Sequence, residues 1–183
     1  MTQFAKAIDG VTGSLGGPFL CTSGQLHAHS QTRLPPLNTF SARESFQEGN
    51  TIGGRILHAV AWNFTDHFLG MVENNVPEAT VKSWMLLRPA GDQSLIPALG
   101  GEEQARMLYL CNVYRLMKMG GDGPCHVDWQ SNFAYVRSPV DRRLWAVHWS
   151  VNYENEWTIG AATVPHPFAD WPTGALVFNC QPS

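Results

Sequence analysis

Apolar positions in the larger part of the chain recur with two different spacings, which predict both helices and strands. Between residues 54 and 73 they recur every three or four positions, a spacing typical of one face of a helix. A β-favouring run within this stretch, Ile56–Phe64, makes a strand the alternative interpretation. A second helical stripe covers Glu102–Met119, and the following Gly120 suits the left-handed residue that commonly ends a helix.

Alternation with a period of two indicates the strands. Thr80–Arg88 has apolar side chains on both faces, which favours a central strand. Leu144–Asn152 and Glu156–Val164 alternate in the same way around a short polar turn, so they predict a hairpin. Shorter strands are expected at Cys125–Trp129, Phe133–Val136 and Ala175–Asn179. This order of elements predicts an α+β fold, a largely antiparallel sheet with two helices packed on one of its faces.

Residues 1–50 differ in composition from the rest of the chain. They are rich in Gly, Ser, Thr, Pro and Gln, and Pro35-Pro36 enforces an extended backbone. We therefore expect two parts, an extended arm at 1–50 and a single α+β domain at 51–183. Such an arm gains burial if it lies on a neighbouring subunit, so we expect neighbouring copies to exchange it.

Charge is scarce in this chain. Lys, Arg, Asp and Glu make up 15% of the 183 residues, against about 25% in an ordinary soluble domain. The formal net charge of −3 disfavours a protein that binds nucleic acid through its phosphates. No apolar stretch is long enough for a membrane-spanning helix, and the N-terminus has no apolar signal region. We expect cytoplasmic synthesis, with assembly into a larger particle as one outcome.

The cysteine and histidine residues at 111–128 provide the first candidate site. Cys-Asn-Val-Tyr followed by Gly-Asp-Gly-Pro-Cys-His-Val-Asp resembles the Cys/His region of cytotoxic-necrotizing-factor-type glutamine deamidases. The resemblance implies Cys111 as nucleophile, His126 as base and Asp128 as the group that orients the base. The chain departs from that family where Tyr109 and Leu110 replace a Ser-Gly pair. The predicted helix also places Cys111 mid-helix, which favours a core residue as the alternative.

Histidines provide two further candidates. His27 and His29 stand two apart, so on a strand they would face the same way and could share a metal ion. No carboxylate follows them closely, and a polar pair in an ordered arm is the alternative. His148 shares the polar face of the predicted hairpin with Asn152 and Glu154, either as a catalytic group or as part of a solvent-exposed face.

Aromatic residues are the last candidates. Trp145 and Trp149 share a face of the predicted hairpin, and Trp157 lies in its second strand. Tryptophan contributes strongly to binding at protein interfaces, so these three residues are the predicted interface, with a core position as the alternative.

The sequence therefore favours a non-enzymatic function. We expect a self-associating structural subunit, such as a component of a shell, capsid or tail, that forms homo-oligomers and needs no cofactor. One alternative is a cysteine-dependent amidase or glutamine deamidase that uses the Cys-His pair. The other alternative is a β-rich module that binds a metal or a small ligand through His27 and His29.

Overall fold

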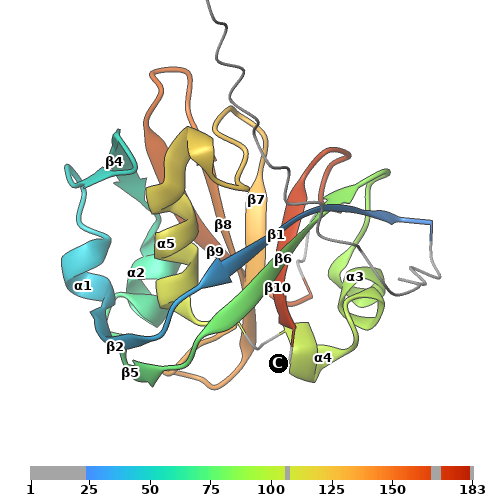
Figure 1. Cartoon of the computed structure of the whole chain (residues 1–183), viewed down its shortest axis with the longest axis horizontal. Coiled ribbons are helices and arrows are strands. Elements are labelled where there is room, and N and C mark those ends of the chain that lie inside the picture. Colours follow the sequence, from blue (N-terminus) through green and yellow to red (C-terminus); the bar gives the residue numbers. More distant parts are fainter. Residues whose placement is uncertain (1–23, 106–107, 166–169, 182–183) are drawn as a thin grey trace, which may run out of the picture.

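The computed structural model describes residues 24–105, 108–165 and 170–181. The chain forms a twisted sheet with helices packed against it (Figure 1). In chain order the elements are β1 (Leu26–Leu34), β2 (Leu37–Ser41), α1 (Ala42–Ser45), β3 (Thr51–Ile52), β4 (Arg55–Val60), α2 (Trp62–Phe68), β5 (Val72–Val76), β6 (Ala79–Leu86), α3 (Asp92–Ala98), α4 (Glu102–Ala105), α5 (Leu110–Met119), the 3-10 turn η1 (Gly120–Asp122), β7 (Asn132–Arg137), β8 (Leu144–Val151), β9 (Trp157–Thr163) and β10 (Leu176–Gln181).

Eight strands form the main sheet in the order β1-β6-β10-β7-β8-β9-β4-β3. The pairs β10–β7 and β4–β9 are parallel and the other pairs are antiparallel. A separate antiparallel pair, β2–β5, lies beside the end of β1. The class is therefore α+β with sheet predominating, as the sequence predicted. In the part of the chain that is described, no helix is long and apolar enough to cross a membrane.

Helices cover both faces of the sheet, and not one face as expected. Along β7, Ala134 and Val136 face a core that α1, α2 and α5 cover, whereas Phe133 and Tyr135 face a smaller core under α3. Figure 1 shows α1, α2 and α5 to the left of the central strands and α3 and α4 to their right. The central strands are thus buried on both faces, which explains their nearly continuous apolar sequences.

The helix expected between residues 54 and 73 is wrong over its first half. Residues 55–60 form β4, which pairs with β9 through Leu57 opposite Trp157 and Val60 opposite Ile159. Only α2 is helical, and it buries the two phenylalanines that the stripe predicted to face the core. The β-favouring run was therefore the better guide, because pairing with β9 outweighs local helix propensity.

The helix expected at 102–119 is interrupted. α4 ends at Ala105, and α5 begins at Leu110 after Tyr109, which has an extended backbone with φ −76° and ψ 151°. This break moves Cys111 from the expected middle of a helix to the first turn of α5. The expected C-terminal Gly120 is confirmed, since it follows α5 with φ +57°.

Much of the expected N-terminal arm belongs to the domain. Residues 26–45 form β1, β2 and α1, and β1 pairs with β6 along its length. Phe40 of this segment and Phe46, which follows α1, are buried in the core with α5, because their rings pack on Tyr114. The boundary at residue 50 is therefore wrong. Residues 1–23 of the expected arm lie outside the described residues.

The remaining predicted strands have mixed outcomes. β6, β8, β9 and β10 confirm the strands expected at 80–88, 144–152, 156–164 and 175–179 within two residues at each end. β7 confirms the strand expected near Phe133. Residues 125–129 form no strand, because they are a loop in which the Asp128 carboxylate accepts the backbone N–H of Gln130.

Candidate functional site

Cys111 is fixed at the start of α5 by a buried carboxylate. Glu73 extends from β5, and its two oxygens accept the backbone N–H groups of Leu110 and Cys111, each at 2.8 Å. The first N–H groups of a helix have no partner within the helix, and the positive end of the helix dipole favours an anion there. Glu73 therefore occupies the position at which a helix start could otherwise stabilise a thiolate.

The thiol of Cys111 stays protonated in this setting. Burial raises its pKa far above that of a free thiol, and the neighbouring Glu73 charge raises it further. Burial also raises the pKa of Glu73, although the hydrogen bonds from Cys111 and Leu110 oppose this effect. Because the thiolate is the nucleophilic form of cysteine, this environment does not favour covalent catalysis by Cys111.

The structure does not bring His126 and Asp128 to Cys111. Asn112, next to Cys111, contacts Cys180 near the end of β10, whereas His126 contacts Gly174 just before its start, so about 20 Å of strand separates the two sites. His126 Nε2 lies 2.8 Å from the carbonyl oxygen of Gly174, and its backbone N–H donates to Asn132. The predicted catalytic set is therefore wrong as a constellation.

The paired histidines lie exposed at the start of β1. A bulge between Ala28 and Ser30 leaves His29 without a paired residue on β6. Its ring lies 6.3 Å from that of His126, and burial, then His126 and His27, lower its pKa. Among the described residues, no group of three metal-ligating atoms includes His27 or His29. The structure thus adds no third ligand to the predicted metal pair.

The three predicted interface tryptophans are core residues of their own chain. Trp149 is 1% exposed and Trp157 is fully buried, with its Nε1 donating to the carbonyl of Ile52 at 2.9 Å. Trp145 is also buried, and its Nε1 donates to the carboxylate of Asp141. The expected aromatic contact surface on this face of the hairpin is therefore wrong, because α2 and α5 cover that face. His148 faces the other core, where its ring lies 6.1 Å from that of Trp171.

Other aromatic residues are exposed instead. Trp62 is 76% exposed at the start of α2, Trp129 is 71% exposed in the loop before β7, and Tyr153 is fully exposed at the tip of the β8–β9 hairpin. The sequence signal for Tyr153 was its place in the predicted turn of the hairpin, whereas Trp129 fell within the strand expected at 125–129, so its exposure was missed.

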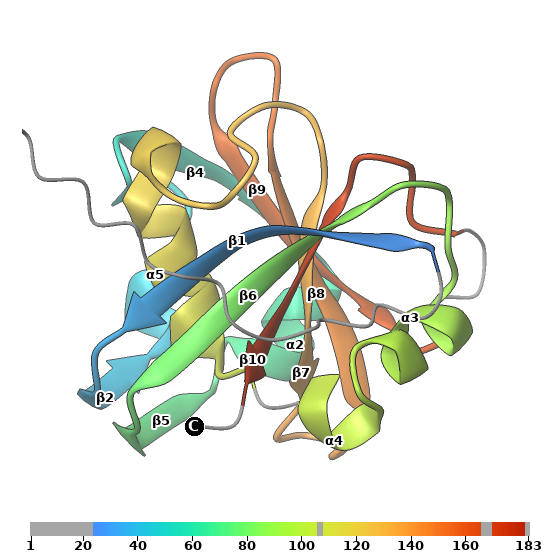
Figure 2. The same cartoon turned by 45° about the vertical axis from the view of Figure 1, so that its right-hand side comes forward.

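Trp129 and Tyr153 lie at one end of the sheet, which we call the apical surface and define as residues 53–56, 119–130 and 152–156. Its three loops contact one another. Arg55 Nε donates to the side chain of Asn155 at 2.9 Å, and the backbone N–H of Val151 donates to the carbonyl of Asp128 at 3.0 Å. Gly53 lies so close to the end of α5 that a Cβ there would be 2.5 Å from the carbonyl oxygen of Met117. Both Figure 1 and Figure 2 show these loops together at the top of the molecule.

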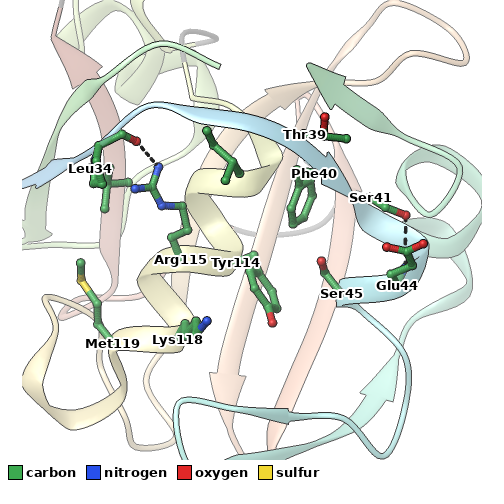
Figure 3. Close-up of a pocket in the computed structure, with 12 residues that line it drawn as sticks. Leu34, Thr39, Phe40, Ser41, Glu44, Ser45, Tyr114, Arg115, Lys118 and Met119 are labelled. Carbon is green, nitrogen blue, oxygen red and sulfur yellow. Dashed lines mark hydrogen bonds between the residues drawn. The ribbon is translucent and has the colours of Figure 1, made fainter. Parts of the chain in front are cut away.

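A groove of about 480 Å³ lies between α5 and the β2–α1 segment (Figure 3). Arg115 and Lys118 line it on the α5 side, and Glu44 lines it on the α1 side. The rings of Phe40 and Tyr114, 5.7 Å apart, lie between them. Arg115 is held by a 2.7 Å hydrogen bond from its Nη1 to the carbonyl of Pro35. The groove therefore offers cations at one end, an anion at the other and aromatic carbon between.

Comparisons with known proteins do not add to this description. No family model, curated protein or solved structure matches the chain.

Proposed function

We propose that this chain is a non-enzymatic structural subunit that associates with copies of itself through the apical surface. The observation that carries the proposal is the exposure of Trp129 and Tyr153 on neighbouring loops, at 71% and 100%. Tryptophan and tyrosine are the residues most enriched among those that dominate interface affinity. A chain with only 15% charged residues also has little ionic surface with which to keep such groups hydrated and separate.

Strand addition at the sheet edges is a less suitable route to association. β1 carries a bulge and the charged Arg33, both of which oppose pairing with another chain. At the other edge, β3 pairs with the start of β4, and the rest of β4 is covered, since Glu48 Oε1 accepts the backbone N–H of Val60 at 3.0 Å and Leu57 exchanges backbone hydrogen bonds with residues 49 and 50. Contacts between side chains at the apical surface remain the better route.

We propose that the apical surface binds the apical surface of a second copy of the chain. This association should depend on the salt concentration. The apical surface holds one arginine, Arg55, and four acidic residues, Asp122, Asp128, Glu154 and Glu156. Two such surfaces repel each other at low ionic strength, and salt screens this repulsion. We therefore expect association to strengthen from low to moderate salt.

Light scattering after size exclusion tests the proposal. The intact chain at high micromolar concentration should have a mass that is a multiple of 20.3 kDa. Replacing Trp129 and Tyr153 together by alanine should weaken association by about thirtyfold or more, since a truncated hot spot costs about 2 kcal/mol. Trp62→Ala is the matched control, because Trp62 is equally exposed but follows the far end of β4, about 20 Å along the strand.

Two results would overturn the proposal. One is a monomeric intact chain at every salt concentration. The other is an oligomer that the double variant retains, which would direct attention to the predicted exchange of the N-terminal arm.

Thiol labelling tests the cysteine-dependent alternative. Burial raises the pKa of Cys125 to about 12 and that of Cys180 to about 11, and it raises that of Cys111 further still. Native protein treated with iodoacetamide at neutral pH should therefore leave these three cysteines unmodified, and unfolding should expose all of them. Rapid labelling of Cys111 in the native state would restore the enzyme as a candidate.

The groove supports a second candidate function, the binding of a small zwitterion. Its volume is within the range of about 300–1,000 Å³ that is common for ligand pockets. The cations Arg115 and Lys118 suit a carboxylate, Glu44 suits an ammonium group, and the aromatic rings suit an apolar link between the two. Amino acids and short peptides have this pattern of charges.

Ligand-observed NMR with a set of amino acids and dipeptides tests the second candidate. Lys118→Gln and Glu44→Gln should each weaken a bound dipeptide. Glu78→Gln is the control, because Glu78 is paired with Arg33 and neither residue lines the groove. Absence of binding by every compound, or equal binding by all three variants, would exclude this candidate.

A further inference from the structure

We propose that His58, Glu154 and Glu156 form a site for a divalent transition-metal ion, of which Zn²⁺ is the best fit. One ligating atom from each residue lies within 4.8 Å of those of the other two. His58 Nδ1 is 3.1 Å from Glu156 Oε2. Glu154 and Glu156 belong to the apical surface and His58 lies at its border, and none of the three lines the groove.

A bulge in the backbone gives His58 its position. The pairing of β4 with β9 shifts register between Leu57 and Ala59, so His58 is the residue left without a partner. Bulges commonly redirect a side chain at the edge of a sheet. Here the imidazole lies against the β8–β9 turn, where both glutamates are found.

The turn that carries the glutamates is fixed by its own hydrogen bonds. Asn152 Oδ1 accepts the backbone N–H groups of Glu154 and Glu156, each at 2.9 Å. Asn155 has a left-handed backbone with φ +63°, and its side chain accepts a hydrogen bond from Arg55 of β4. Asn152 also donates to Glu156 Oε2 at 3.4 Å. Ligands held in this way lose little entropy when a metal binds, which favours affinity.

The electrostatics of the cluster favour a cation. Glu154 and Glu156 place two carboxylates within 4.8 Å of each other, and like charges at that separation repel. A protonated His58 would offset one of these charges. A divalent ion would offset both and would bind the imidazole in its neutral form.

The donor types indicate which ion would bind. Ca²⁺ and Mg²⁺ prefer oxygen ligands alone, whereas imidazole nitrogen suits Zn²⁺ and its neighbours in the first transition series. One imidazole and two carboxylates leave a fourth tetrahedral position for water, as in open zinc sites.

Isothermal titration of the full chain, free of any histidine tag, with Zn²⁺ tests the site. Glu154→Gln is the cleanest variant, because only the backbone of Glu154 takes part in the turn. It should weaken Zn²⁺ binding by at least about tenfold, since even loss of a group that merely orients a ligand costs that much. His58→Ala should remove the binding. Circular dichroism would establish that both variants are folded.

The double variant His27→Ala and His29→Ala is the matched control. It removes two exposed imidazoles from the pair that the sequence suggested as metal ligands, and it should retain the affinity of the intact chain. The inference is wrong if the intact chain shows no saturable Zn²⁺ binding, or if the control loses binding while the His58 variant keeps it. Because Glu154 and Glu156 belong to the apical surface, the same titration on the Trp129→Ala and Tyr153→Ala double variant separates the metal site from self-association.

Discussion

The two cores of the sheet each contain one buried carboxylate near a helix start, and they hold it in different ways. Glu73, which is 6% exposed, accepts the backbone N–H groups of Leu110 and Cys111, and the Cys111 thiol also donates to it. Asp92, which is 3% exposed, accepts side-chain donors through Oδ1, the hydroxyl of Tyr135 at 2.7 Å and Nε1 of Trp171 at 2.8 Å.

The difference lies in what each carboxylate determines. Glu73 determines where a helix begins, and its donors cannot move without unwinding α5. Asp92 joins the first residue of α3 to β7 and to the segment that holds Trp171, 79 residues later in the chain. Trp171 is itself stacked on Phe133 at 4.0 Å between ring centroids. One carboxylate thus stabilises local backbone structure, and the other connects distant parts of the fold.

Removal of the Glu73 side chain should have the largest effect. Glu73→Ala leaves two buried backbone N–H groups without an acceptor, and each such group costs about 1–3 kcal/mol. We expect the free energy of unfolding to fall by about 2–6 kcal/mol in urea denaturation, the range for two such groups. Glu78→Ala, at an exposed ion pair with Arg33, should cost less than about 1 kcal/mol. Similar losses in the two variants would contradict the role given to Glu73.

Substitutions around Asp92 should each lower the free energy of unfolding by less, because its donors are side chains that can be removed one at a time. Tyr135→Phe removes one donor and leaves the bond from Trp171, so we expect a loss of about 1–2 kcal/mol. The same substitution in an Asp92→Ala background should cost clearly less, since its acceptor is already gone. A double-mutant cycle in urea measures this coupling. Additive losses would show that the hydroxyl of Tyr135 gains nothing from Asp92.

The same contrast explains which elements the sequence predicted. Alternation of apolar and polar residues within a single strand is a local pattern, and it predicts β6, β8, β9 and β10. No local pattern predicts the start of α5, because it depends on Glu73, which lies 37 residues before Leu110. The apolar stripe through Cys111 continues across the break, so nothing local separates α4 from α5.

The candidate site residues were harder to predict for a related reason. Trp149 and Trp157 alternate as an exposed face would, but helices cover both faces of the sheet, so alternation does not distinguish inside from outside here. Exposure of Trp129 and Tyr153 depends on where turns fall. The cluster of His58 with Glu154 and Glu156 depends on a bulge and a parallel strand pair that join segments about a hundred residues apart, which no local pattern encodes.

The smallest expected effect is a dependence of the free energy of unfolding on pH, which reports the protonation of Glu73. Burial raises its pKa above the ordinary value of 4.5, so the folded chain retains this proton at pH values where the unfolded chain has lost it. The stabilisation from this group is complete below about pH 4.5 and is lost as pH rises through the folded-state pKa. Glu73→Gln cannot titrate, so the stability of the intact chain relative to this variant should fall over that interval and then level off. Urea denaturation from pH 4 to 8 measures it. A relative stability that rises with pH would mean that the hydrogen bonds from Leu110 and Cys111 outweigh burial, and the carboxylate would then act as a permanent anion at the start of α5.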